Sequence, residues 1–442
     1  MRGKDTIFAL SSGALPAGIA VVRSSGPASG ALVAALAGRV PQARLAELAT
    51  LRDPATGEEI DRGLLLFFPG PASVTGEDVA EFHLHGGRAV VARLLAVLSS
   101  VAGCRMAEAG EFTRRAFDNG KLDLTEAEGL ADLIDSETEG QRKQALRQMS
   151  GALRLRAEGW RAGVLEAMAL IAADLDFSDE DDVGEKAAVG VRAVIMAVLG
   201  DVEEALSSSR IGERIRDGVR VVIAGAPNVG KSSLLNRLAG RDVAIVSRIA
   251  GTTRDAIEVR LDIGGVPVDL VDTAGIREAG DEIEAEGIRR SRARMEDADL
   301  VLHVIDATAE RDAAAAVDVG SGPVLLVRNK IDLGEVAPGV REGFGISAAT
   351  GEGLDQVIAA LGRFVSETYG TREGGVVTRE RQRRLVGDLA VALRAALGRL
   401  DDMPELAAEE LRRAAQAIGR LTGTIDVEEM LGTIFGRFCI GK

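Results

Sequence analysis

The residues Gly225-Ala226-Pro227-Asn228-Val229-Gly230-Lys231-Ser232 decide the fold of the central part of this chain. They fit the pattern G-x-x-x-x-G-K-[ST], in which backbone N–H groups turn inward around phosphate oxygens. An apolar run, Arg220–Ala224, precedes them, and a helical run, Ser233–Leu238, follows and adds the positive end of its helix. Lys231 can then neutralise the outer phosphates, and the Ser232 hydroxyl can hold Mg²⁺. The segment therefore predicts a nucleotide-binding phosphate loop.

Three later segments indicate that the base is guanine: Asp272-Thr273-Ala274-Gly275, Asn329-Lys330-Ile331-Asp332 and Ser347-Ala348. Asp272 can reach the metal through water, and Gly275 frees a backbone N–H for the γ-phosphate. The Asp332 carboxylate can accept hydrogen bonds from the guanine N1–H and 2-amino groups, which adenine does not offer. The predicted nucleotide-binding residues are Asn228, Val229, Gly230, Lys231, Ser232, Ser233, Asp272, Thr273, Ala274, Gly275, Asn329, Lys330, Asp332, Ser347 and Ala348.

The surrounding residues, 217–372, alternate short β-branched runs with helical segments. We expect strands at Arg220–Ala224, Val266–Val271, Asp299–Ile305 and Val324–Val327. Such alternation predicts a doubly wound, mostly parallel sheet of the Ras-like type.

The predicted GTPase lacks one familiar catalytic group. The residue after Asp272–Gly275 is Ile276, where common switch GTPases carry a Gln that orients water. A carboxylate from the downstream segment must replace it; the candidates are Asp281, Glu282, Glu284 and Glu286. Asn228 could ligate a monovalent cation that replaces an arginine finger. Thr253, in Ile249–Asp255, is the candidate second Mg²⁺ ligand, although an ordinary capping cluster is the alternative there.

Composition limits the remaining possibilities. The chain has 442 residues, of which 46% are hydrophobic and 27% charged, so a long disordered protein is excluded. The net charge of −15 argues against binding nucleic acid with the whole surface, but leaves room for a local basic face. The two cysteines, Cys104 and Cys439, cannot form a disulfide framework. With no apolar run long enough for a membrane span, we expect a cytoplasmic protein without membrane contact.

Two other patterns of apolar residues flank the central segment. Residues 1–118 contain short apolar runs that predict strands, such as Gly18–Arg23 and Val79–Leu84, and a predicted helix at Ala89–Leu98. This combination predicts an α+β domain. Residues 119–216 and 373–442 have apolar residues near a 3.6-residue period, for example Leu385, Leu389 and Leu393. We predict that these two stretches form one discontinuous helical domain, into which the GTPase domain, 217–372, is inserted.

The whole chain closely resembles the MnmE (TrmE) family of tRNA-modification GTPases. Besides the nucleotide motifs, the resemblance rests on Thr75–Asp78, His85–Gly87, Asn119–Leu124 and the terminal Phe438-Cys439-Ile440-Gly441-Lys442. It implies an N-terminal tetrahydrofolate-binding and dimerisation domain, a helical domain, and a GTPase domain inserted into the helical one.

The resemblance also implies roles for individual residues. Glu284 falls on the carboxylate that orients the water network, and Lys231 acts with it in hydrolysis. Mg²⁺ positions fall on Ser232 and Thr253, and potassium positions on Asn228, Ser247, Ile249 and Thr252. Contacts to 5-formyltetrahydrofolate, or a related tetrahydrofolate, fall on Arg23, Glu81, Lys121 and Lys442.

The implied function is a potassium-activated GTPase that works as a homodimer with an FAD-dependent partner, MnmG (GidA), in a heterotetramer. Together they would add a carboxymethylaminomethyl or aminomethyl group to C5 of the wobble uridine of certain tRNAs. A regulatory or ribosome-assembly GTPase without a role in modification is the alternative. Binding of a folate would discriminate between the two.

Several other residues could carry chemistry or simply be structural. Cys439 could be a redox thiol or nucleophile, or a small buried residue near a constrained tail. Glu81, His83 and His85 alternate on one predicted strand face and could hold a metal, or merely be hydrogen-bonded. Three arginine clusters could face tRNA or be ordinary solvated surface: Arg114-Arg115; Arg154, Arg156 and Arg161; and Arg379, Arg381, Arg383 and Arg384.

Overall fold

The structure, a computed structural model, describes residues 5–176, 184–245, 259–272, 298–308, 322–334, 343–369, 375–425, 428–436 and 438–441. It divides into two compact units. The first contains Met1–Ala131, Met149–Leu165 and Leu411–Lys442, and the second contains Asp132–Gln148 and Glu166–Glu410. Each unit therefore combines residues from more than one of the four segments expected from the sequence.

The first unit contains a six-stranded sheet in the order β3-β4-β5-β2-β1-β6, antiparallel except for the β1–β6 pair. Side chains on β5 alternate, so that Ala80, Phe82 and Leu84 are buried in one core with residues of α1 and α2. The elements are β1 (Thr6–Leu10), β2 (Ala17–Ser25), α1 (Ser29–Ala37), β3 (Glu47–Arg52), β4 (Glu59–Phe68), β5 (Val79–Gly86), α2 (Arg88–Ser99) and β6 (Cys104–Met106).

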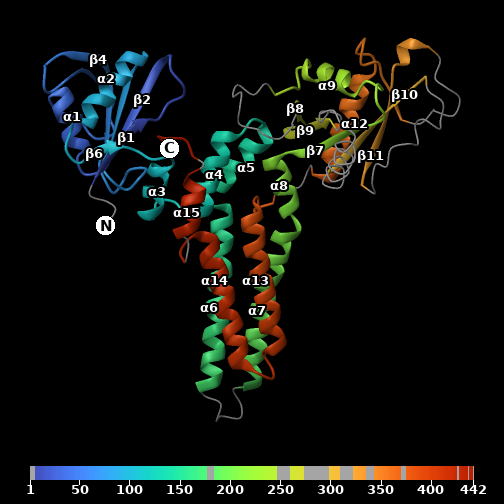
Figure 1. Cartoon of the computed structure of the whole chain (residues 1–442). Helices are drawn as coiled ribbons and strands as arrows, with labels where there is room; N and C mark the ends of the chain where they lie inside the picture. The colour runs from blue at the N-terminus through green and yellow to red at the C-terminus, as the bar shows by residue number, and fades with distance from the viewer. Residues whose placement is uncertain are drawn as a thin grey trace, which may run out of the picture. The chain divides into compact units, whose positions relative to one another are not determined.

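The helical stretches come together, although the chain separates them. The long helices α7 and α13 run side by side (Figure 1), with Leu385, Leu389 and Leu393 of α13 buried. The predicted discontinuous helical domain is therefore confirmed. Among the described helices, none is both long and apolar enough to cross a bilayer. The helices are α3 (Glu111–Asp118), α4 (Leu124–Asp135), α5 (Glu139–Met149), α6 (Ala152–Asp176), α7 (Gly184–Ser207), α8 (Ser209–Asp217), α13 (Glu380–Arg399), α14 (Pro404–Thr422) and α15 (Glu428–Phe435).

The second unit contains the predicted doubly wound domain. Its sheet has the order β12-β11-β10-β7-β9-β8 and is parallel except for the β8–β9 hairpin, as the sequence predicted. Helices α9 and α12 contribute Leu234, Leu238, Leu354 and Leu361 to its core. The elements are β7 (Val219–Ala224), α9 (Lys231–Ala239), β8 (Val259–Ile263), β9 (Val266–Asp272), β10 (Leu300–Asp306), β11 (Val324–Asn329), a 3₁₀ turn (Ile331–Leu333), β12 (Phe344–Gly345) and α12 (Leu354–Thr368).

One carboxylate in the second unit binds arginines from both helical stretches. Asp132, on α4, accepts hydrogen bonds from Arg216 at 2.8 Å and from Arg379 at 2.6 Å. The side chains of Asp132 and Arg379 are each only 14% exposed. A guanidinium that is largely shielded from water needs a carboxylate partner to offset its lost hydration. Asp132 is that partner for both Arg216 and Arg379, and it thereby links the end of α8 to the start of α13.

We predict that Asp132→Ala lowers the free energy of unfolding by about 3 kcal/mol, since it leaves two arginines without this carboxylate. The matched control is Asp401→Ala, which removes a 69% exposed partner of Arg192. That substitution should change stability by less than about 1 kcal/mol. Urea unfolding followed by the helical circular dichroism signal measures both. Equal shifts for the two variants would contradict the role given to Asp132.

Candidate nucleotide and folate sites

The phosphate loop has the backbone that the motif requires. Gly230 has φ +97°, a conformation that favours glycine. A Cβ there would also overlap the Asn329 side-chain nitrogen, so both the backbone and the packing require glycine. Asn228 also has a positive φ, of 64°. The Lys231 ammonium donates hydrogen bonds to the carbonyls of Gly225 at 2.9 Å and Ala226 at 3.0 Å. It therefore lies across the loop that would surround the phosphates.

Ser232 and Asp272, which the sequence places next to Mg²⁺, are hydrogen-bonded to each other in the structure. Ser232, in the first turn of α9, donates a hydrogen bond from Oγ to Oδ2 of Asp272 at 3.0 Å. Asp272 ends β9 and is only 2% exposed. A hydroxyl and a carboxylate are the hard oxygen donors that Mg²⁺ prefers, so this pair fits the expected metal. Ser233 follows on the exposed side of the helix, and Val229 is buried beneath the loop.

The base-side residues converge on the same end of the sheet. Asn329 ends β11; its Nδ2 donates to the Val229 carbonyl at 2.7 Å, and its Oδ1 accepts from the Ala348 N–H at 2.9 Å. Ser347 is fully buried beside Ala348, while Asp332 is exposed in the following turn. The Asp332 carboxylate, which would recognise guanine, is thus accessible to a ligand. The Asn329 side-chain amide is held in place by its two hydrogen bonds.

Lys330 is held by a carboxylate that sequence reasoning missed. Its Nζ donates to Oδ2 of Asp306 at 2.7 Å, at the end of β10. Burial alone would raise the pKa of Asp306, but hydrogen bonds from Lys330 and Thr308 lower it below its usual value. Asp306 is therefore charged at neutral pH and orients the Lys330 stem. A carboxylate at the end of a parallel strand, the usual place for ligand contacts, was the available signal.

Several predicted site residues lie outside the described residues, so their roles stay predictions: Ser247, Ile249, Thr252, Thr253, Thr273, Ala274, Gly275, Glu284 and Lys442.

The described residues that the family resemblance assigns to a folate lie in the first unit. Arg23 on β2 and Glu81 on β5 form an ion pair at 2.8 Å, directly opposite each other in the sheet register. The other Glu81 oxygen is 3.2 Å from Nε2 of His83, and His85 contacts Asp61 instead. Each of the two histidines therefore has a carboxylate partner of its own, which is the hydrogen-bonded arrangement named as the alternative to a metal site.

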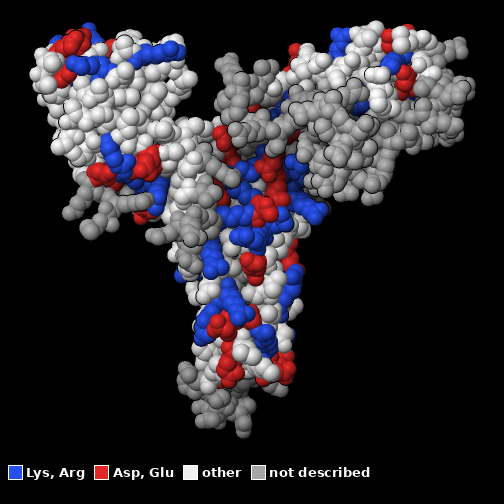
Figure 2. All heavy atoms as spheres, viewed as in Figure 1, with Lys and Arg blue, Asp and Glu red and all other residues white. Residues whose placement is uncertain are grey.

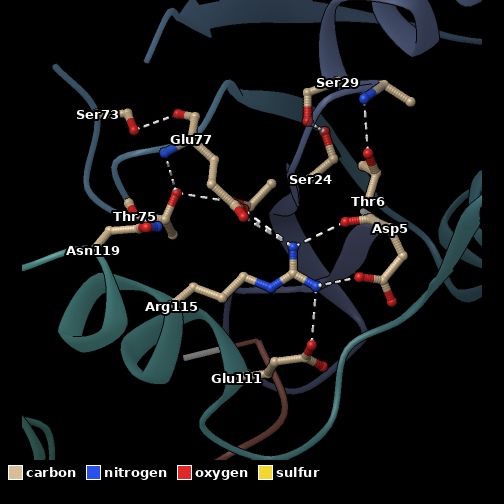
Figure 3. Close-up of polar contacts among 12 residues, drawn as sticks. Asp5, Thr6, Ser24, Ser29, Ser73, Thr75, Glu77, Glu111, Arg115 and Asn119 are labelled. Carbon is tan, nitrogen blue, oxygen red and sulfur yellow. Dashed lines mark hydrogen bonds and ion pairs between the residues drawn. The ribbon is translucent and has the colours of Figure 1, made fainter. Parts of the chain in front are cut away.

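Arg115 is the centre of a buried polar network in the first unit (Figure 3). It donates to Asp5, Glu77 and Glu111 at 3.0–3.1 Å. Burial disfavours its charge, but Glu77 and Glu111 outweigh burial and raise the pKa of Arg115. The hypothesis that Arg114-Arg115 face a tRNA is therefore wrong for Arg115, which is only 9% exposed. Local sequence could not distinguish a buried arginine from a solvated one.

This network brings separate family motifs together. Asn119 donates from Nδ2 to the Thr75 carbonyl at 2.7 Å, and Ser25 Oγ lies 2.7 Å from Thr75 Oγ1 (Figure 3 shows the Asn119 and Thr75 side). A Cβ on Gly76 would lie 3.2 Å from Cε of Lys121, so Lys121 adjoins the same loop. The segments Thr75–Asp78 and Asn119–Leu124 are thus in contact with each other.

The C-terminal motif joins the N-terminal segment. Ile440 pairs with Ala109 in an isolated β-bridge, and the Ser11 hydroxyl donates to the Gly441 carbonyl at 2.9 Å. Both contacts lie within the first unit. Cys439 is an exposed free thiol, so its alternative reading as a small buried residue is wrong. This tail is held by backbone contacts, which leave the thiol accessible.

The other arginine clusters are largely matched by acids. Figure 2 shows basic and acidic side chains intermingled over the helical part. Arg154 contacts Glu158 at 2.9 Å, and Arg383 contacts Glu213 at 2.8 Å. Such pairing is typical of a solvated surface and gives no uniform basic face on the side shown.

Comparison with known proteins identifies the family. The profile described as the MnmE helical domain matches residues 124–439, and that described as the GTP-binding protein TrmE N-terminus matches residues 6–121. A protein of Rhodopseudomonas palustris named "tRNA modification GTPase MnmE" is 52% identical, with 99% of each chain covered. One of the same name from Parvibaculum lavamentivorans is 54% identical, covering 99% of this chain and 100% of its own. The chain belongs to the MnmE (TrmE) family of tRNA modification GTPases.

Proposed function

We propose that this protein hydrolyses GTP and uses the hydrolysis cycle to modify tRNA. The observation that carries this proposal is the convergence of Ser232, Asp272 and Asn329 at the carboxyl end of a parallel sheet. That edge is where doubly wound folds bind their ligands. The names of the full-length relatives support the second half of the proposal.

The described residues support specific roles in this reaction. Lys231 and the N-terminus of α9 would bind the phosphates, since both present positive charge to the loop. Ser232 and Asp272 would hold Mg²⁺, which supplies charge to the β- and γ-phosphates. Asp332 would select guanine, and Asn329 would hold the Ser347-Ala348 loop at the base in place by accepting a hydrogen bond from the Ala348 N–H.

The finer catalytic proposal concerns the missing glutamine. Glu284 would orient the attacking water and Thr253 would complete the Mg²⁺ site. Potassium bound by Asn228, Ser247, Ile249 and Thr252 would supply the positive charge of an arginine finger. Support for the Asn228 role comes from its position inside the phosphate loop and from its exposure, which leaves the side-chain amide open to a cation.

The proposed modification is addition of a carboxymethylaminomethyl or aminomethyl group to C5 of a tRNA wobble uridine, in the cytoplasm. The chain would act as a homodimer with the FAD-dependent MnmG (GidA) in a heterotetramer. A tetrahydrofolate would bind near Arg23, Glu81, Lys121 and Lys442, with Cys439 close by in sequence. The support for this site is the Arg23–Glu81 pair and the docking of the C-terminal tail at Ser11.

The test of the proposed function is the tRNA itself. In cells that carry only Asp272→Ala, we expect wobble-uridine modification to fall at least about tenfold, because loss of one Mg²⁺-side carboxylate should slow hydrolysis by that factor or more. Mass spectrometry of tRNA nucleosides measures the change. Asp355→Ala, which removes an 84% exposed partner of Arg241 in the same domain, is the control. Unchanged modification in the Asp272 variant would favour the regulatory or ribosome-assembly alternative.

Nucleotide binding itself depends on the close packing of Gly230. We expect Gly230→Ala to weaken GDP binding at least about tenfold, because the new methyl group must displace Asn329 and strain the backbone. Gly240→Ala is the matched control, since its nearest neighbour would be 3.7 Å away and its φ is −87°. Calorimetric titration with GDP and Mg²⁺ measures both affinities. Full affinity in the Gly230 variant would remove the phosphate loop from the proposal.

The cation proposal predicts a salt preference. At equal ionic strength, GTP hydrolysis should be at least about tenfold faster in KCl than in NaCl, because oxygen ligands spaced for K⁺ would coordinate the smaller Na⁺ poorly. Asn228→Ala should abolish this difference, whereas Asn236→Ala, on α9 beyond the loop, should keep it. Phosphate release gives both rates. Equal rates of the unsubstituted protein in the two salts would exclude a potassium role.

A further inference from the structure

One arginine joins the nucleotide-binding hairpin to the helical segment within the second unit. Arg260, on β8, lies directly opposite Asp269 of β9 in the strand register. Its Nε donates to Oδ1 of Asp269 at 2.6 Å, and its Nη2 donates to Oδ2 at 2.9 Å. The remaining nitrogen, Nη1, donates to Glu137 at 2.9 Å. The planar guanidinium therefore fixes two carboxylates from different parts of the chain at once.

Asp269, the strand partner of Arg260, lies on the same strand as Asp272, the carboxylate predicted near Mg²⁺. Asp269 is three residues before Asp272 on β9, which is roughly 10 Å at the rise of a strand. β9 is hydrogen-bonded to β7 on one side and to β8 on the other. Because such a strand is held on both sides, a displacement at Asp272 would be passed along it to Asp269 and Arg260.

The helical side adds a second contact to the same hairpin. Glu137 lies between α4 and α5, and Gly140, in the first turn of α5, donates its N–H to the Gly265 carbonyl at 3.0 Å. A Cβ on Gly140 would overlap that carbonyl, so the approach requires glycine. The start of α5 is thus attached both to the middle of the hairpin and to its turn.

A polar cavity lies beside these contacts. This cavity, of about 230 Å³, is lined by Asp132, Asp135, Gln144, Arg216 and Arg260, among others. The Oε1 atom of Gln144 is buried there without a protein partner, while its Nε2 donates to the Gly212 carbonyl. An apolar core would offer no directional contacts, whereas a polar junction held by a few hydrogen bonds and ion pairs depends on the geometry of each one.

We propose that Arg260 is a positioning residue that couples the nucleotide state at Asp272 to helices α4 and α5, through Glu137 and the Gly140–Gly265 contact. The inference rests on the proposed function and deepens it by naming the residues that transmit the cycle. A ligand shifts a conformation only through contacts that differ between the two states. The ion pair of Arg260 with Glu137 would be such a contact, because it joins the β8–β9 hairpin to the helical segment.

The test breaks the joint from the helical side, where Asp269 and the nucleotide site keep their own partners. In the full chain, hydrogen–deuterium exchange of residues 136–149 should differ between GDP and a non-hydrolysable GTP analogue. Glu137→Gln should reduce that difference by at least about half, with GTP hydrolysis within about twofold of the unsubstituted rate. Wobble-uridine modification should fall about fivefold. Gly140→Ala should act in the same direction.

The matched control is Glu203→Gln, which weakens an exposed pair with Arg394, 2.6 Å apart, between α7 and α13. It should leave all three measurements unchanged. The inference is overturned if residues 136–149 do not respond to the nucleotide, if they respond fully in both the Glu137 and Gly140 variants, or if Glu137→Gln lowers hydrolysis and modification equally. Failure of the proposed function is distinct: tRNA modification would then be independent of Asp272, whereas the exchange response needs no tRNA.

Discussion

The nucleotide site depends on the side-chain amide of Asn329. It is 2% exposed, donates to the phosphate loop at Val229 and accepts from Ala348 in the loop after β12. One amide thereby fixes the phosphate-side and base-side loops to each other. A carboxylate could not donate the first bond, and an ammonium could not accept the second. The Asn329 nitrogen occupies the space that a Cβ at position 230 would need. Glycine at position 230 is therefore what allows the Asn329 amide to approach the phosphate loop.

The insertion of the GTPase domain depends on a second polar junction, at Asp299. The chain enters the domain after α8 and leaves it at Tyr369, and both sides contact this carboxylate: Arg214 at 2.9 Å and the Tyr369 hydroxyl at 3.1 Å. Burial, and then the charge of Asp299, raise the pKa of Tyr369 to about 12, so the phenol remains a hydrogen-bond donor at neutral pH. A domain whose two ends meet can be inserted without disturbing the pairing of α7 with α13.

The sequence predicted the parts of this structure that local patterns determine. The strand at Val266–Val271 and the turn at Gly230 follow from β-branched runs and from glycine at a required positive φ. The partners of Arg260 and Arg115 could not be predicted, because Glu137 is 123 residues from Arg260 and Asp5 is 110 residues from Arg115. An arginine has the same local signature whether its partner is water or a distant carboxylate. Only the three-dimensional fold decides which arginines become buried connectors.

Charge places a final constraint on how a tRNA would be bound. The chain carries a net charge of −15, and its helical arginines are interspersed with acids (Figure 2). An arginine such as Arg383 that already contacts a carboxylate offers a phosphate little extra attraction, because its charge is largely neutralised nearby. Screening shortens the reach of the remaining field to about 8 Å at physiological salt. The proposed heterotetramer would satisfy this constraint, since a partner protein can contribute cations that the face of this chain seen in Figure 2 does not gather into one patch.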